Sequence, residues 1–235
     1  MIEILDKKQL SPSYFLLKTD IAQPSLPGQF YMLGSDDKSK LLGRPISVFD
    51  YDKKTTSFLV AQVGEGTKNL AQLEVGDQIQ GSGPYGNGFP QILNRKIGLV
   101  GGGTGVAPFH FLARRYGDRE DMDFTLYLGF NEDQGLEDLF SGLASPVHFK
   151  YGGLITDSVD FDGLDMFFTC GPRPMMEAVQ REGKKRDKHV YLSLETRMGC
   201  GFGACLSCSI RTKQGRKKVC LDGPVFSGDL LIWEN

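Results

Sequence analysis

Short apolar runs separated by turn-forming residues fill the first 92 positions of the chain. Pairs such as Pro27-Gly28, Asp36-Asp37 and Gly76-Asp77 bound these runs, a pattern typical of β-strands. Their regular spacing predicts a small antiparallel β-barrel. A short helix fits residues 67–73, with Thr67 as its N-cap. We expect the strands at residues 2–5, 14–19, 29–33, 46–50, 57–63 and 77–81.

The pattern changes near residue 95, where apolar runs begin to alternate with stretches of helical periodicity. Phe109, Leu112, Ala113 and Tyr116 recur at three- to four-residue spacing, which indicates an amphipathic helix. Alternating strands and helices are typical of an α/β doubly wound parallel sheet. We expect its strands at residues 97–100, 124–130, 147–151, 166–169 and 189–194, and further helices at 136–143 and 174–181.

A multidomain organisation follows from these patterns. Residues 1–92 are expected to form the barrel and residues 93–195 the α/β domain. Residues 196–235 are expected to form a small C-terminal subdomain with short strands at 209–212 and 230–233. This last part contains four of the five cysteines.

The four clustered cysteines have the spacing C-x4-C-x2-C, followed by eleven residues before the fourth. That triplet is the plant-type spacing for a [2Fe–2S] cluster. Tetrahedral thiolate ligation also suits zinc, and disulfides or free thiols are further alternatives. Glycines interleave with the ligands, as expected where backbone N–H groups turn toward a cluster. The expected ligands are Cys200, Cys205, Cys208 and Cys220.

Composition argues against several classes of function. The 235-residue chain is 40% hydrophobic and has a formal net charge of −2, so nothing indicates nucleic acid or an anionic membrane surface. The start shows no cationic segment followed by an apolar run, and no apolar stretch approaches the length of a membrane span. Clustered cysteines without a secretion signal then predict metal binding in a reducing cytoplasm.

Two segments predict a nucleotide site at one edge of the sheet. Gly101-Gly-Gly-Thr-Gly-Val-Ala-Pro108 joins an expected strand to an expected helix, where glycine N–H groups and a helix N-terminus favour a phosphate. Cys170-Gly-Pro172 ends a later strand, and ligands bind at the carboxyl ends of such strands. The alternatives are a strand–helix turn without a ligand and a Cys170 that is simply a small buried residue.

Three polar residues after the strand at 124–130, Asn131, Glu132 and Asp133, are expected near the adenosine ribose of a bound dinucleotide. Two acidic side chains there would repel a 2′-phosphate, which favours NADH over NADPH. An ordinary solvated loop is the competing interpretation.

A flavin follows from the chemistry of the two redox groups expected in this chain. A nicotinamide transfers a two-electron hydride, whereas a [2Fe–2S] cluster accepts one electron at a time, so a flavin with a stable half-reduced state is the usual intermediary. The barrel offers two phosphate-like segments for it, Arg44-Pro-Ile-Ser47 and Gly64-Glu-Gly-Thr67. Taken singly, each of these is also compatible with a surface turn.

Together these motifs, with Gly83-Pro84 and Gly86-Asn-Gly-Phe89, resemble the ferredoxin–NADP reductase superfamily. Within it, the stretch from Met198 to Cys208 and the segment Val219-Cys-Leu-Asp-Gly-Pro-Val-Phe226 are similar to the electron-transfer subunits of type B, NAD-dependent dihydroorotate dehydrogenases. The resemblance covers essentially the whole chain.

The resemblance implies a set of site residues. It implies a [2Fe–2S] cluster on the four cysteines, and Cys170 near the nicotinamide as a catalytic candidate. For NAD it implies Gly102, Gly103, Thr104, Gly105, Cys170, Gly171 and Pro172. For FAD it implies Arg44, Pro45, Ile46, Ser47, Ala61, Gln62, Val63, Gly66 and Thr67.

The resemblance further implies a partner, an FMN-containing catalytic subunit, in an assembly of two copies of each chain that serves pyrimidine biosynthesis. Because that subunit oxidises dihydroorotate, no dihydroorotate site is expected here. The three histidines, His110, His148 and His189, are scattered and are expected to be structural. A subunit of an NAD(P)H:ferredoxin or sulfide-linked oxidoreductase, and a zinc-stabilised nucleotide-binding module, are the alternative functions.

The partner surface is expected near the cluster, because electron transfer needs a short path. Residues 199–207 and 223–233 are the candidates, with Phe202, Leu206 and Phe226 as apolar contacts. These side chains could instead simply pack against residues 199–207, the cysteine loop.

Overall fold

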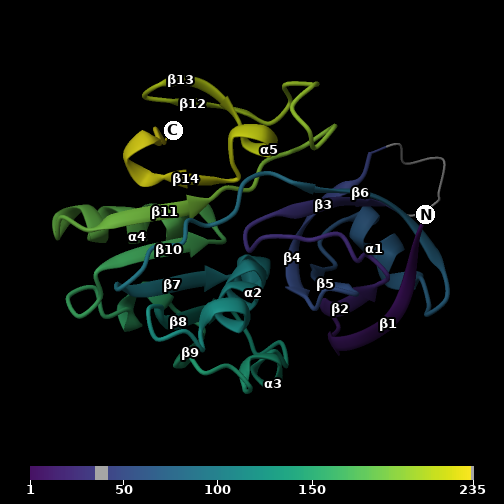
Figure 1. Ribbon diagram of the computed structural model, residues 1–235, viewed down its shortest axis with the longest axis horizontal. Coiled ribbons are helices and arrows are strands. Elements are labelled where there is room, and N and C mark those ends of the chain that lie inside the picture. The colour runs from purple at the N-terminus through teal and green to yellow at the C-terminus, as the bar shows by residue number, and fades with distance from the viewer. Residues whose placement is uncertain (35–41, 234–235) are drawn as a thin grey trace.

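The computed structural model describes residues 1–34 and 42–233, so the turn predicted at Asp36-Asp37 lies outside the described residues. The N-terminal part is a closed barrel with the strand order β1-β2-β5-β4-β3-β6 (Figure 1). All its pairs are antiparallel, and all six strands predicted from the sequence are present. The strands are β1 (Ile2–Ser11), β2 (Tyr14–Thr19), β3 (Phe30–Gly34), β4 (Arg44–Tyr51), β5 (Thr56–Ala61) and β6 (Gln78–Tyr85).

Alternation along the strands fills the barrel. In β2, Phe15, Leu17 and Thr19 are buried while their neighbours are partly exposed. The helix that follows β5 is α1 (Glu65–Gln72), and its N-cap is Gly64. The prediction of Thr67 as N-cap is wrong by one turn: Thr67 lies at N3, where its hydroxyl accepts the Gly64 N–H at 3.2 Å and donates to the Gly64 carbonyl at 3.0 Å. The Thr67 hydroxyl, inside the first turn, thus satisfies the backbone groups of Gly64 that an N-cap side chain would otherwise serve.

The second sheet has six strands in the order β14-β11-β10-β7-β8-β9. The five strands of the predicted α/β domain are parallel to their neighbours, and β14 adds an antiparallel edge next to β11. This confirms the doubly wound sheet, with an edge strand that sequence patterns did not predict. The strands are β7 (Lys96–Gly102), β8 (Asp123–Phe130), β9 (Val147–Tyr151), β10 (Met166–Cys170), β11 (His189–Ser193) and β14 (Val225–Ser227).

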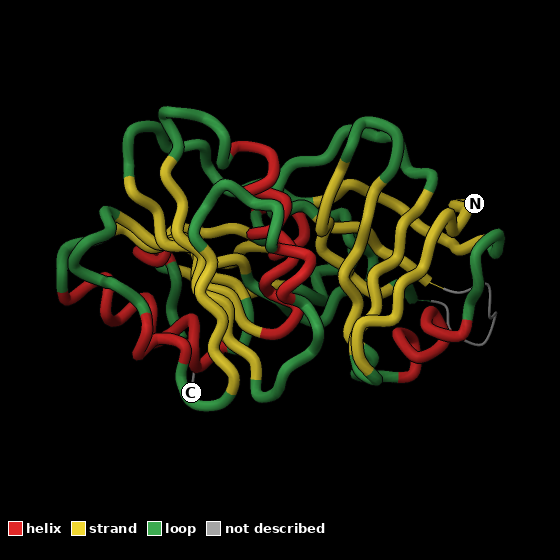
Figure 2. Tube along the Cα trace, turned by 90° about the horizontal axis from the view of Figure 1, so that it is seen from below, coloured by secondary structure: helices red, strands yellow, loops and turns green. Residues whose placement is uncertain are grey.

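Helices connect these strands, and α2 and α4 lie on opposite sides of the sheet (Figures 1 and 2). The helix predicted at 136–143 is shorter than expected, because the N–H groups of Leu139 and Leu143 donate to carbonyls three residues back, the pattern of isolated turns. The helices are η1 (Gly103–Val106), α2 (Ala107–Tyr116), α3 (Glu137–Phe140), η2 (Ile155–Ser158) and α4 (Arg173–Lys185). None of the helices in the described ranges is long and apolar enough to cross a membrane.

The C-terminal part lies along the α/β sheet (Figure 1). A hairpin of β12 (Ser209–Thr212) and β13 (Gly215–Lys218) leads into α5 (Val219–Asp222), then β14 and η3 (Gly228–Leu230). The strand predicted at 230–233 is wrong: Leu231 forms only an isolated bridge to Thr212, and the Trp233 indole N–H donates to Gln180 of α4. Packing against α4, not a ladder, orders the last described residues.

Barrel and sheet are joined through α2. The His110 ring stacks on Phe49 of β4 with centroids 3.9 Å apart. Its Nδ1 lies 3.0 Å from the Phe49 carbonyl oxygen and its Nε2 lies 3.1 Å from that of Leu139. Burial lowers the pKa of this imidazole. His110 therefore has a structural position in the interface between the two parts.

Candidate functional site

A cavity of about 320 Å³ lies where the three parts of the chain meet. The barrel contributes the residues of the segment Arg44 to Ser47, together with Ala61, Val63 and Thr67. The α/β domain contributes Thr104, Gly105 and Cys170, so the structure brings two sets of sequence-predicted residues to one place. Residues that sequence patterns missed complete the lining: Phe30, Leu59, Ser193, Leu194, Glu195, Met198 and Pro224.

One corner of this central cavity is built for an anion. The Arg44 side chain lies against Gly66, where a Cβ would come within 2.7 Å of the Arg44 Nε. Arg44 Nη1 donates to the Leu42 carbonyl at 2.7 Å, which fixes the guanidinium beside the first turn of α1. A guanidinium and a helix N-terminus therefore converge here, and glycine at position 66 lets the Arg44 side chain lie close against the helix.

One predicted flavin residue lies elsewhere. Gln62 lines a separate shallow groove with Gln9, Ser11 and Lys68, and the backbone N–H of Gln62 donates to the Ser13 carbonyl at 2.8 Å. Successive residues of an extended chain face opposite sides, which explains why Ala61 and Val63 reach the central cavity and Gln62 does not.

The glycine-rich loop and the Cys-Gly-Pro segment pack backbone against backbone. They end neighbouring parallel strands, since Cys170 of β10 pairs with Gly101 of β7. A Cβ at Gly102 would lie 2.9 Å from the Pro172 ring, and one at Gly171 would lie 2.6 Å from the Gly102 carbonyl oxygen. Gly171 has a φ of +141°, a conformation that favours glycine. The sequence predicts this contact correctly because the carboxyl ends of parallel strands share an edge.

A second cavity, of about 500 Å³, opens on the other side of the same two segments. Gly102, Gly103 and Pro172 line it, whereas Thr104, Gly105 and Cys170 line the central cavity. The segments therefore form a wall common to both. Sequence patterns missed the rest of its lining, which includes Tyr14, Gly129, Phe130, Gln134, Ile155, Thr156, Met175 and Arg181.

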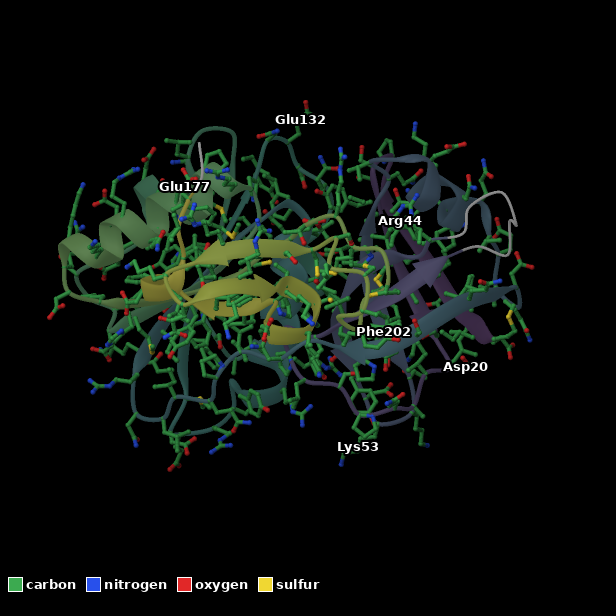
Figure 3. The ribbon with its side chains drawn as sticks, turned by 90° about the horizontal axis from the view of Figure 1, so that it is seen from above. Asp20, Arg44, Lys53, Glu132, Glu177 and Phe202 are labelled. Atoms are coloured by element: carbon green, nitrogen blue, oxygen red, sulfur yellow. The ribbon has the colours of Figure 1, made fainter. Side chains whose placement is uncertain are left out.

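Of the three polar residues expected near the ribose, only Asn131 lines this second cavity. Glu132 lies at the outer edge of the molecule and points away from it (Figure 3). The Asp133 carboxylate accepts the Gly135 N–H at 2.8 Å and helps to raise the pKa of Tyr151, after burial and the Glu137 carboxylate. Negative charge thus gathers near the carboxyl end of β9 rather than inside the cavity.

Two titratable groups line the central cavity. Burial raises the pKa of the Cys170 thiol to about 12, so this thiol stays neutral at physiological pH. The nearby Glu195 carboxylate contributes to that shift, and desolvation in turn raises the pKa of Glu195, although this residue is exposed at the edge of the cavity. The arrangement places a neutral thiol and an acidic side chain at one cavity.

The four clustered cysteines fall into two pairs. The Sγ atoms of Cys208 and Cys220 lie 3.1 Å apart, and both residues are buried. The Cys200 Sγ accepts the N–H groups of Ala204 and Cys205, at 3.3 and 3.4 Å, nearer the surface. In a two-iron cluster each iron takes two thiolates, so paired sulfurs match that group.

The two pairs differ in their electrostatics. The Ser207 hydroxyl, 3.2 Å from the Cys205 Sγ, lowers the pKa of Cys205 to about 6. Burial raises the pKa of Cys220 to about 12. In the residues that the structure describes, no group of three or more His, Cys, Asp or Glu side chains converges around a single metal position.

The cysteine loop packs on the barrel beside the central cavity. A Cβ at Gly201 would lie 2.9 Å from the Tyr85 ring, and the rings of Tyr85 and Phe202 are 6.3 Å apart. Phe202 and Leu206 are exposed, as an interface would require. Phe226 is 5% exposed in β14, so its predicted role as an exposed contact is wrong.

Solved structures share this arrangement. The chain superimposes on the NADH-dependent reduced ferredoxin-NADP oxidoreductase with a TM-score of 0.85 and 26% identity, covering 98% of this chain and 89% of that one. The ferredoxin-NADP⁺ reductase of Plasmodium falciparum gives a TM-score of 0.63 at 15% identity, covering 80% and 93% of the two chains. The fold is therefore that of a flavin-dependent reductase of the ferredoxin–NADP reductase superfamily, here with a cysteine-rich C-terminal part.

Sequence comparison narrows this class. Residues 195–232 match the family model for the iron–sulfur cluster binding domain of dihydroorotate dehydrogenase B. The electron transfer subunits of NAD⁺-dependent dihydroorotate dehydrogenase B from Clostridium acetobutylicum and Caldanaerobacter subterraneus are each 37% identical to the chain, over 88% of its length and 86% and 87% of theirs. The chain belongs to the family of dihydroorotate dehydrogenase B electron transfer subunits. The resemblance inferred from the sequence is thereby confirmed, and with it the class of oxidoreductase subunits.

Proposed function

We propose that this chain carries electrons between NAD(H) and a dihydroorotate dehydrogenase catalytic subunit, through FAD and a [2Fe–2S] cluster, in pyrimidine biosynthesis. One observation carries the proposal: the central cavity takes its walls from the barrel, from the glycine-rich and Cys-Gly-Pro segments, and from the stretch leading into the cysteine loop. A group in that cavity would contact all three parts of the chain.

FAD fits the central cavity by the chemistry of its walls. Arg44 and the first turn of α1 would hold the pyrophosphate, and Ile46, Ser47 and Ala61 would flank the ring system. When bound, the flavin supplies the exchange between two-electron hydride transfer and single-electron transfer. The residues of the chain would position the rings and exclude water, and the Glu195 side chain lies at the same cavity.

NAD(H) fits the second cavity. Gly102, Gly103 and Pro172 line this cavity and would contact the dinucleotide. Thr104, Gly105 and Cys170 lie on the side of the shared wall that faces the central cavity, where the nicotinamide would meet the flavin. The neutral Cys170 thiol is a positioning group rather than a nucleophile. NADH is the expected form, supported by relatives named for NAD⁺.

The cluster is proposed on Cys200, Cys205, Cys208 and Cys220. Their arrangement in an outer and a buried pair supports two irons, and the match of residues 195–232 to an iron–sulfur domain supports the same conclusion. Gly201 and Gly203, at φ values of +82° and +92°, turn the loop around the site.

The partner is proposed to be an FMN-containing catalytic subunit in an assembly of two copies of each chain, in the cytoplasm. The relatives are named electron transfer subunits, which supports a separate catalytic chain. Because dihydroorotate would be oxidised there, this chain needs no dihydroorotate site of its own.

The test is an anaerobic visible spectrum before and after NADH, followed by mixing with the catalytic subunit. Flavin and iron–sulfur bands that both bleach with NADH, together with NAD⁺ reduction that requires dihydroorotate and both chains, are expected. A colourless zinc protein would refute the electron-transfer proposal. Bleaching without any dihydroorotate-linked activity would favour a ferredoxin-linked reductase, the function of the similar solved structure.

A further inference from the structure

The β12–β13 hairpin concentrates positive charge next to the cysteine loop. Five of the 27 Lys and Arg residues of the chain lie within residues 211–218, and none of its 29 Asp and Glu residues does. The chain as a whole has a formal net charge of −2, so the hairpin opposes the charge of the remaining molecule. The cations are Arg211, Lys213, Arg216, Lys217 and Lys218.

The register of the hairpin works against its own stability. Arg211 lies directly opposite Arg216, and both side chains are exposed. Like charges at directly opposed positions destabilise a strand pair, and this sheet has only two strands. Folding alone would favour an opposite charge at one of these positions, so the repeated cation points to a role outside the fold.

Exposed apolar side chains lie on the cysteine loop and on α5, the two segments that the hairpin joins. Phe202, Leu206 and Leu221 are 56%, 60% and 54% exposed. Leu206 has a φ of +62°, in the left-handed region, so a large apolar side chain is held in solvent where glycine would be less strained. The Lys218 ammonium donates to the Gly203 carbonyl at 3.0 Å, which ties the hairpin to the loop.

Both features lie on one face. The hairpin and the cysteine loop occupy the top of Figure 1, and Figure 3 looks down on that face with Phe202 labelled. An exposed apolar group flanked by cations of one sign matches a partner with an apolar hollow and an acidic rim.

We propose that Phe202, Leu206 and Leu221, together with Arg211 and Arg216 of the adjoining hairpin, form a docking face for an acidic rim on the catalytic subunit. This inference rests on the proposed function, which requires the partner's cofactor to come close to the outer cysteine pair. The cations accelerate encounter by long-range attraction, and the apolar side chains hold the docked complex.

The test measures association of this holoprotein with the FMN-containing catalytic subunit by stopped flow, between low and high ionic strength. The variant R211E/R216E reverses the charge. The single variant R211E places opposite charges across the hairpin, which stabilises it while removing net positive charge. The matched control K53E/K54E changes two exposed cations of the β4–β5 turn of the barrel. Cofactor spectra verify that each variant is loaded.

At low salt we expect R211E/R216E to slow association by about tenfold or more, R211E by an intermediate factor, and K53E/K54E by less than about twofold. The differences should disappear at about 0.5 M salt because screening removes the attraction. Equal slowing by the control, or unchanged rates in both hairpin variants, would overturn the docking face. If the unmodified chain forms no complex at any salt concentration, the proposed function fails instead.

Discussion

The packing of the glycine-rich loop on the Cys-Gly-Pro segment predicts the effect of one added methyl group. In Gly105→Ala the new Cβ would overlap the Cys170 carbonyl and lie 2.6 Å from the Gly171 nitrogen. Ordinary van der Waals contact begins at 3.4 Å, whereas the Gly171 nitrogen would lie at 2.6 Å. The two segments must therefore separate by about 0.8 Å, the difference between 3.4 and 2.6 Å. Because the obstructing atoms belong to the backbone, no side-chain rotation relieves the overlap.

The cost follows from this geometry. Overpacking destabilises folded proteins by about 1–3 kcal/mol, and a backbone obstruction places this variant near 2–3 kcal/mol. For a chain of this size that corresponds to a fall in Tm of roughly 5–10 °C. The displaced wall separates the two cavities, and an error of about 1 Å in the position of reacting groups can slow a reaction by about 100-fold.

Thermal unfolding by circular dichroism and stopped-flow bleaching of the flavin by NADH measure these two effects. Gly142→Ala is the matched control, because a Cβ there meets no atom within 4 Å. If Gly105→Ala unfolds and bleaches like Gly142→Ala, the inferred contact between the two segments is refuted.

Two further substitutions test individual site residues. Cys208→Ser should lose the bound iron and its visible absorption while Cys170→Ser keeps both, and equal iron content would contradict the ligand assignment. Arg44→Ala should weaken FAD binding about 10- to 100-fold, as expected for a lost charge-assisted hydrogen bond of about 1.5–3 kcal/mol, and fluorescence titration against Lys54→Ala tests this.

Local patterns were sufficient for most of the fold. Strands such as Tyr14–Thr19 and Val147–Tyr151 match their predicted bounds, because alternation or an apolar run coincides there with flanking turn residues. The edge strand Val225–Ser227 could not be predicted in this way, since three residues carry no period and the partner strand β11 lies more than thirty positions earlier. Leu230 to Trp233 reads as a strand for its apolar composition, but contacts with α4 decide its conformation.

The candidate sites likewise contain some features that the sequence predicts and others that it could not. Sequence reasoning placed the glycine-rich loop beside the Cys-Gly-Pro segment because parallel strands end at one edge, and the structure has this contact. It could not predict that Glu195 and Pro224 would reach the cavity beneath Arg44, because no spacing rule links a barrel strand to residues more than 150 positions later. Gln62 shows that a residue inside a correctly predicted segment can still miss the site. In an extended chain alternate side chains face opposite sides, so Gln62 points away from the cavity that Ala61 and Val63 line.

Hydrogen-bond donors are distributed unequally over the two cysteine pairs, so the two pairs stabilise negative charge to different degrees. The Ser207 hydroxyl and the N–H groups of Ala204 and Cys205 all point at the outer sulfurs, whereas the buried pair lies among apolar side chains and receives one N–H, from Cys220 to the Cys208 Sγ at 3.4 Å. Donors stabilise negative charge, so the surface end favours it more than the buried end does. The Lys218 ammonium of the basic hairpin donates to the Gly203 carbonyl at 3.0 Å and so brings positive charge to the outer loop as well. The features that would favour an electron at the surface and those that would attract an acidic partner therefore coincide, which is the arrangement that transfer to a second protein requires.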